Sequence, residues 1–100
     1  MMNEISFELI SKAGTAFSML VEALREARQR HFDSAEQKRL EAEQLMNEAH
    51  NLQTQLIVKE MNGEDNQVNV LLVHAQGTLM NTILMSTVVE EFILLYKEGE

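Results

Sequence analysis

Apolar residues recur at steps of three and four along the first third of the chain. The stripe begins at Ile5 and ends at Ala27, while Glu8, Lys12 and Glu22 lie off it. This spacing keeps side chains on one face of an α-helix. The pattern predicts an amphipathic helix over residues 4–30 with the buried stripe Ile5, Leu9, Ala13, Ala16, Leu20, Leu24 and Ala27.

A second helical stripe follows the segment "RHFDSAEQ". Asp33 and Glu36 have the spacing of a capping box, in which each side chain bonds a main-chain N–H at a helix start. Gly63 can end the helix, because glycine adopts the left-handed conformation at little cost. These signals predict a helix over residues 33–62 with the stripe Ala35, Ala42, Leu45, Ala49, Leu52 and Leu56.

The last third of the chain, predicted as a helix over residues 67–98, has a different pattern. No charged residue lies between Asp65 and Glu90, and apolar residues occupy two sides. One side holds Leu72, Leu79, Ile83 and Ile93; the other holds Val73, Met80, Leu84, Val88, Phe92 and Leu95. A helix that is apolar nearly all round must be buried nearly all round. Two partner helices cannot cover it, so we expect another copy of the chain to do so.

The three predicted helices form one all-α domain over residues 1–100. Short connections make neighbouring helices antiparallel, which gives an up-down-up three-helix bundle. The third helix could also be a membrane span by length. Polar residues argue against that alternative, since Asn69, His74, Gln76, Thr78, Asn81, Thr82, Ser86 and Thr87 interrupt the apolar run.

Composition narrows the possible functions. The chain has 100 residues, is 45% hydrophobic, and contains neither proline nor cysteine. The lack of cysteine excludes disulfides, thiolate metal sites and cysteine nucleophiles. A net charge of −8 argues against binding to nucleic acid or anionic lipid. The N-terminal segment lacks the features of a secretory signal, so a cytoplasmic location is expected.

The candidate for chemistry is His74, in the apolar segment "LLVHAQGTLM". On a helix it shares a face with Gly77, Thr78 and Asn81. One interpretation is a polar layer that fixes register in an oligomer core. The other is a nucleophile, because a neutral imidazole nitrogen can accept a phosphoryl group. A metal site and a Ser/His/Asp device lack the other residues they need, and no cofactor is predicted.

The sequence also resembles a known family along nearly its whole length. The segments "ISFELISKAGTAFSMLVEALREAR", "FDSAEQ", "EAHNLQTQLIVKEMNGE", "LLVHAQGTLM" and "VVEEFILLYKE" are similar to enzyme IIA of the lactose/cellobiose class of the phosphoenolpyruvate-dependent sugar phosphotransferase system. The resemblance implies a homotrimer around the third helix. It also implies that His74 takes a phosphoryl group from phospho-HPr and passes it to a cysteine of enzyme IIB during sugar uptake. Gln76 and Thr78 occupy supporting positions in the motif.

Two positions depart from the family's His-Ala-Gln-Asp-His-Leu-Met pattern. Gly77 replaces the Asp that binds a metal ion on the trimer axis, and Thr78 replaces a second His. Without that Asp we expect no metal and a trimer held by apolar packing. The changes also raise an alternative function, a non-catalytic or regulatory homologue with a weakened phosphorelay site. A two-component histidine phosphotransfer domain fits less well, because such domains are typically four-helix units.

Overall fold

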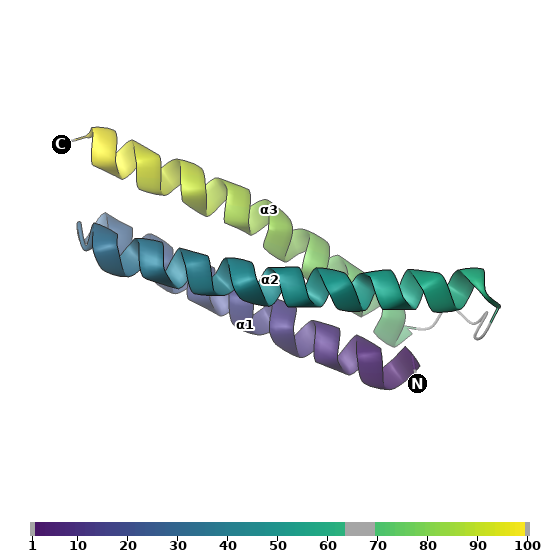
Figure 1. Cartoon of the computed structure of the whole chain (residues 1–100). Helices are drawn as coiled ribbons and strands as arrows, with labels where there is room; N and C mark the ends of the chain where they lie inside the picture. Colours follow the sequence, from purple (N-terminus) through teal and green to yellow (C-terminus); the bar gives the residue numbers. More distant parts are fainter. Residues whose placement is uncertain (1, 64–69, 100) are drawn as a thin grey trace.

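The computed structural model describes residues 2–63 and 70–99 and shows three antiparallel helices (Figure 1). They are α1 (Met2–Arg28), α2 (Phe32–Met61) and α3 (Val70–Glu98). The molecule is a rod with extents of 54 × 18 × 16 Å. The all-α, up-down-up arrangement predicted from the sequence is confirmed. The predicted start of the third helix, at residue 67, lies outside the described residues.

Small residues bring α1 close to both other helices. Every alanine of the predicted α1 stripe is fully buried, and so are Ala35, Ala42 and Ala49 on α2. Alanine side chains let helix backbones approach closely, and leucines at intervals fill the space that remains. Leu9 and Leu20 on α1, Leu56 on α2 and Leu79 on α3 are the large side chains in this packing.

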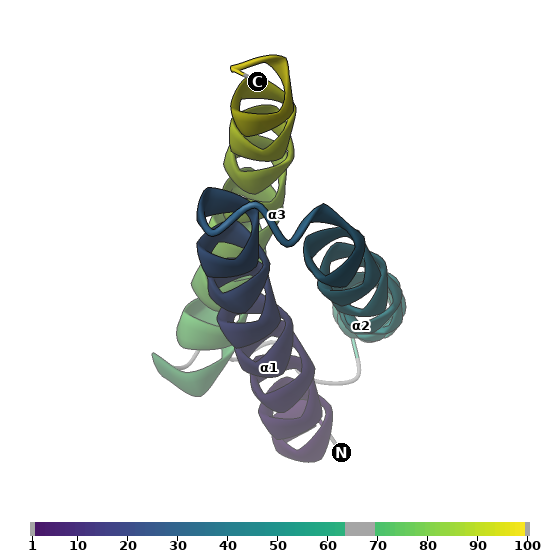
Figure 2. The same ribbon diagram turned by 90° about the vertical axis from the view of Figure 1, so that its left-hand side faces the viewer.

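The helix α3 lies mainly on α1 and diverges from α2 toward its C-terminal end (Figure 2). Its buried residues are Leu72, Ala75, Leu79, Thr82, Val89 and Ile93. Ile83 was placed on the same side as Leu72, Leu79 and Ile93, which are buried, but its own side chain is 42% exposed. Ile83 faces α2, and there it lines an open groove with Arg39, Glu43 and Met46. The divergence of α3 from α2 explains this exposure.

The buried apolar residues form two clusters, one toward each end of the rod. One contains Leu9, Leu52 and Leu79, and the other contains Leu20, Val89 and Ile93. Between them along α3 lies Thr82, which is fully buried. Its hydroxyl lies 3.2 Å from the carbonyl oxygen of Ala13 on α1 and 2.8 Å from that of Thr78. Either carbonyl can accept the hydroxyl proton, so the buried hydroxyl of Thr82 is satisfied.

The first turn differs from its prediction. α1 ends at Arg28, and Arg30 takes the left-handed conformation with φ 69°. α2 begins at Phe32, its cap is His31, and no side chain bonds the cap. The predicted capping box of Asp33 and Glu36 is therefore wrong. Gly63 has φ 73° after the end of α2, as predicted.

Glu36 pairs with Arg39 one turn further along α2 instead. The two carboxylate oxygens of Glu36 accept hydrogen bonds of 3.0 and 2.6 Å from the guanidinium. These hydrogen bonds favour the charged carboxylate and hold the pKa of Glu36 below its ordinary value. Glu36 pairs with Arg39 and does not form a capping box, because Asp33 lies inside the first turn of α2 and not at its N-cap.

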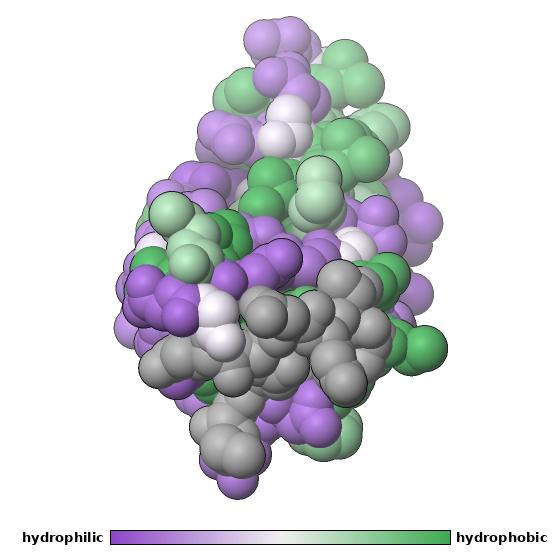
Figure 3. All heavy atoms as spheres, turned by 90° about the vertical axis from the view of Figure 1, so that its right-hand side faces the viewer, coloured by the Kyte–Doolittle hydropathy of each residue, from purple (hydrophilic) through white to green (hydrophobic). Residues whose placement is uncertain are grey.

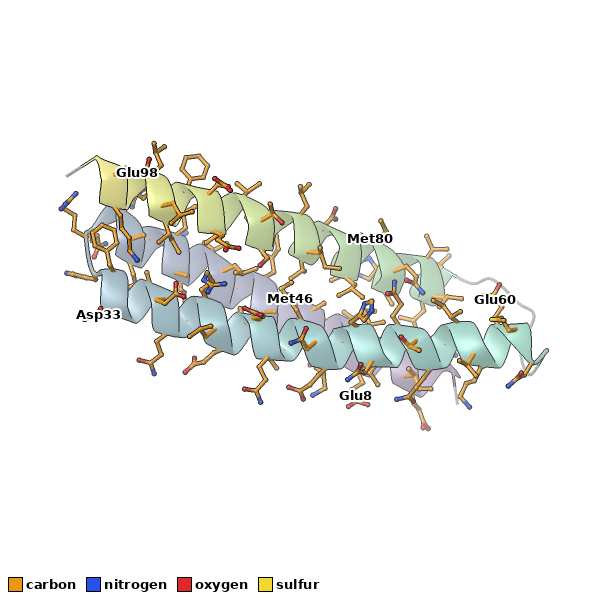
Figure 4. All side chains as sticks on the ribbon, turned by 45° about the horizontal axis from the view of Figure 1, so that its top comes forward. Glu8, Asp33, Met46, Glu60, Met80 and Glu98 are labelled. Atoms are coloured by element: carbon orange, nitrogen blue, oxygen red, sulfur yellow. The ribbon has the colours of Figure 1, made fainter. Side chains whose placement is uncertain are left out.

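The side of α3 that faces away from α1 and α2 is apolar and exposed. Met80 is 65% exposed and Leu84 is 64% exposed, and Figure 4 shows Met80 pointing away from the other helices. Figure 3 shows hydrophobic side chains gathered over the part of the molecule that α3 forms. By length and composition alone α3 could cross a membrane, although core helices of soluble proteins pass the same test. The exposed face is the second apolar side predicted from the sequence.

The packing predicts how much individual leucines stabilise the bundle. Leu79→Ala should lower the free energy of unfolding by about 3 kcal/mol, because it removes a fully buried side chain from between α1 and α3. Leu40→Ala is the matched control, since Leu40 is 53% exposed on α2, and its cost should be under about 1 kcal/mol. Urea unfolding at one fixed protein concentration measures both values. Equal losses would contradict the packing described for α1 and α3.

Candidate functional site

The imidazole of His74 is exposed on the N-terminal half of α3, about one turn from the helix start at Val70. It stands next to the buried residue Ala75 on α3. Among the described residues, none forms a hydrogen bond or an ion pair with the ring. The ring is therefore accessible as a nucleophile, and within one chain it is not part of a polar core layer.

A groove between α1 and α3 begins at His74. It has a volume of about 330 Å³. The α3 wall is formed by His74, Thr78, Asn81 and Thr82, and the α1 wall by Ile10, Gly14 and Phe17. None of these residues carries a formal charge. A phosphoryl group brought to His74 would therefore meet no carboxylate from the groove walls.

Thr78 lies one turn beyond His74 but does not use its hydroxyl on the ring. The hydroxyl donates a 2.8 Å hydrogen bond to the main-chain carbonyl of His74. This is a common helix bond for threonine, and it directs the proton into the helix backbone. The hydroxyl proton is therefore used on the main chain and not on the imidazole.

Gln76 points away from His74, as its two-residue spacing predicts. Its side-chain oxygen accepts a hydrogen bond from the amide of Gln53 on α2. Gln76 thus joins α3 to α2 near the apolar cluster that contains Leu52 and Leu79. It cannot touch a phosphoryl group on the His74 of its own chain while it holds this contact.

Gly77 lies on the exposed apolar side of α3, between Val73 and Met80 along the same face. A Cβ atom built at Gly77 meets nothing within 4 Å. The single chain therefore gives no steric reason for glycine at this position. Within residues 2–63 and 70–99, no group of three or more His, Cys, Asp or Glu side chains could hold a metal ion.

The α1 wall of the groove was missed in the sequence analysis. Ile10, Gly14 and Phe17 belong to a second stripe on α1 that runs beside the buried alanine stripe. The signal is present in the sequence as a three-four repeat, and its members are Phe7, Ile10, Gly14, Phe17 and Val21. Phe7 is exposed, whereas the other members are half-buried. This stripe is what gives the histidine an apolar neighbour from another helix.

Comparison with known proteins identifies the family of the chain. The chain matches the family described as "PTS system, Lactose/Cellobiose specific IIA subunit" over residues 4–97. It is 40% identical to the lactose-specific EIIA component of Staphylococcus epidermidis over 95 residues, which cover 95% of this chain and 91% of the relative. It is 37% identical to the oligo-beta-mannoside-specific EIIA component of Bacillus subtilis, over 94% of this chain and 86% of the relative.

Solved structures show the same fold. The cellobiose-specific enzyme IIA of Bacillus anthracis superposes with a TM-score of 0.91 at 43% identity, covering 95% of this chain and 87% of that one. A IIA(chitobiose)–HPr complex of Escherichia coli gives a TM-score of 0.85 at 33% identity, with 98% and 95% covered. The match spans all three helices and the segment that carries His74. The chain therefore belongs to the lactose/cellobiose-specific IIA subunit family of the sugar phosphotransferase system.

Proposed function

We propose that the chain is a cytoplasmic phosphoryl carrier that works through a phosphohistidine at His74. It accepts the phosphoryl group from phospho-HPr and passes it to a cysteine of enzyme IIB, which serves sugar uptake. The observation that carries this proposal is the exposed imidazole of His74 at the end of an uncharged groove. The solved complex of a related IIA protein with HPr supports the choice of donor.

The transfer requires only positioning and an available lone pair. A neutral ring nitrogen of His74 attacks the phosphorus, and the donor's N–P bond breaks with its electron pair returning to the donor imidazole. The donor ring takes up the proton that the His74 ring gives up, so no oxidant or reductant is involved. Passage to enzyme IIB repeats the displacement with a thiolate as the nucleophile. The thiolate forms an S–P bond as the His74 N–P bond breaks, and the His74 ring keeps the electron pair and takes up the proton that the thiol gave up. Such transfers depend on in-line geometry and on the electrostatics of the site.

The exposed apolar side of α3 supports a homotrimer. Val73, Met80, Leu84 and Leu95 lie on that side, and all four side chains are more than half exposed in the single chain. An apolar surface of this length is typical of a contact between subunits. Gly77 lies in the middle of it. In a trimer built on α3, a glycine there brings neither a charge nor a metal ligand to the contact, so apolar packing holds the subunits and no metal is needed.

A second function is favoured by the surroundings of His74. The Thr78 hydroxyl is bonded to a main-chain carbonyl, and no charged group of the described residues contacts the ring. Few polar groups are placed to stabilise a phosphoryl group on His74. Such a site suits a non-catalytic or regulatory homologue, whose trimer binds a partner and relays phosphate slowly. The family resemblance around the intact His74 still favours the carrier.

The carrier function predicts that His74 is the residue that becomes phosphorylated. After incubation with phosphoenolpyruvate, enzyme I and HPr, intact mass measurement should show one acid-labile phosphoryl adduct per chain. His74→Ala should abolish it, because the attacking nitrogen is gone. His50→Ala is the matched control, since His50 is also exposed on a helix, and it should keep the adduct. An adduct that persists in His74→Ala would refute the proposal.

The two departures from the family motif can be reversed together. In Gly77→Asp/Thr78→His, measured as a trimer verified by sedimentation, the rate of transfer from phospho-HPr should stay within a few-fold of that of the unchanged chain, because the nucleophile and its groove are intact. Rapid-quench kinetics measures the rate. An increase of about 10²-fold, the size of a general acid–base contribution, would instead support the regulatory homologue.

The trimer predicts a response to charge on α3. Leu84→Lys should dissociate the assembly, because it places a charge in an apolar contact without a partner. Leu40→Lys, on the exposed side of α2, should leave the mass unchanged. Sedimentation equilibrium measures both masses. A trimer that survives Leu84→Lys would show that the subunits meet elsewhere.

A further inference from the structure

Thr82 is a polar residue inside the apolar contact between α1 and α3. Its side chain is fully buried, and along α3 it lies between the two apolar clusters. Its hydroxyl is 3.2 Å from the main-chain carbonyl oxygen of Ala13 on α1 and 2.8 Å from that of Thr78 on α3. The hydroxyl proton is thus shared between a carbonyl of its own helix and one of the neighbouring helix. The contact with Ala13 links α3 to α1.

The stability of the bundle does not require this hydroxyl. A valine has almost the same shape as a threonine and needs no hydrogen-bond partner when it is buried. Both carbonyls lie inside helices and accept a hydrogen bond from the N–H group four residues further on. Removing the hydroxyl would therefore leave neither carbonyl unpaired. The hydroxyl adds direction to the contact, because a hydrogen bond requires a defined distance and angle, whereas apolar packing does not.

α3 needs a directional contact because it packs mainly on one neighbour. It lies along α1 and diverges from α2 (Figure 2). Near His74 a hydrogen bond from Gln53 to Gln76 joins it to α2. Successive residues of a helix are rotated by about 100°, so Thr82 and Gln76 point about 120° apart around α3. Two hydrogen bonds in different directions oppose any roll of the helix about its own axis.

A roll of α3 would move the imidazole of His74. Side chains reach about 5–6 Å from a helix axis, so a roll of about 10–15° displaces the ring by about 1 Å. In-line attack requires reacting atoms that are aligned and about 3–3.5 Å apart. A misplacement of about 1 Å, caused by a substitution far from the chemistry, can cost about 10²-fold in rate. The geometry of transfer therefore depends on a buried contact about two turns away from the reacting atoms.

We propose that Thr82 is a positioning residue for phosphoryl transfer, whose hydrogen bond to the carbonyl of Ala13 fixes the rotation of α3 and so the direction of the His74 imidazole. This role rests on the proposed carrier function. Thr82 is not a catalytic residue, because a fully buried side chain two turns from His74 does not touch the phosphoryl group. It acts through the helix that carries the nucleophile.

Thr82→Val tests the role, because it keeps the shape of the side chain and removes the hydroxyl. In rapid-quench kinetics at increasing concentrations of phospho-HPr, the maximal rate of His74 phosphorylation should fall by about tenfold. The concentration of phospho-HPr that gives half of the maximal rate should change by less than about twofold, because the surface that meets the donor is unchanged. Thr82→Ser keeps the hydroxyl and should retain the maximal rate.

Thr87→Val is the matched control. The Thr87 hydroxyl also bonds the carbonyl four residues earlier, that of Ile83, but Thr87 is exposed and lines the groove on the α2 side of α3. This variant should react at the rate of the unchanged chain. Phosphoramidate, a small phosphoryl donor that aligns without docking, should label His74 equally in all the chains. Urea unfolding and sedimentation equilibrium should show an unchanged midpoint and trimer mass for each variant.

The outcomes separate the positioning role from the function on which it rests. A lower maximal rate in Thr82→Val, with Thr82→Ser and Thr87→Val normal, supports the role. A normal maximal rate in Thr82→Val overturns it, and so does an equal loss in Thr87→Val, since the local helix bond would then be responsible. A lower urea midpoint, a lost trimer or equal slowing with phosphoramidate would assign the hydroxyl to stability or to the nucleophile itself, against the proposal. If the unchanged chain takes no phosphate from HPr, the carrier function fails, and the positioning role fails with it.

Discussion

Close packing of α1 against both other helices is the constraint on which the rest of the structure depends. Its alanines let α2 and α3 approach, and the leucines between them fill two apolar clusters. α3 follows α1 and diverges from α2. One helix can cover only one side of another, so the opposite side of α3 stays apolar and exposed. The bundle is complete as a fold but leaves a surface for other molecules.

The same packing sets the position of the histidine. Three surfaces of α3 meet near His74: the buried side against α1, the exposed apolar side, and the groove with Ile10, Gly14 and Phe17. A residue at this boundary can be reached by a second protein while the helix below it stays rigid. Phosphoryl transfer between two proteins needs both conditions, because the nucleophile must be accessible and also held in place. Thr82, bonded into the α1–α3 contact two turns along, helps to fix that part of α3.

The absence of charge is the common feature of the site. Gly77 brings none to the exposed side of α3, and Thr78 turns its hydroxyl to the carbonyl of His74. Gln76 is bonded to Gln53 of α2. The chemistry proposed for the site thus depends on the imidazole and on the partner proteins. The partner must then supply much of the electrostatic stabilisation of the transferred group, which makes the fit between the two surfaces more important.

The sequence by itself determined the three helices, their buried stripes and the surplus apolar side of α3, because helical periodicity is a local property of the chain. It also identified His74 as the candidate residue, since a single histidine in an apolar segment can be recognised from the sequence. Where local sequence signals compete, only the tertiary structure decided which interaction forms. Glu36 forms an ion pair with Arg39 in place of the capping box with Asp33. Ile83 is exposed because α3 diverges from α2. The groove at Gly14 depends on how two helices cross, and no spacing within one helix contains that information.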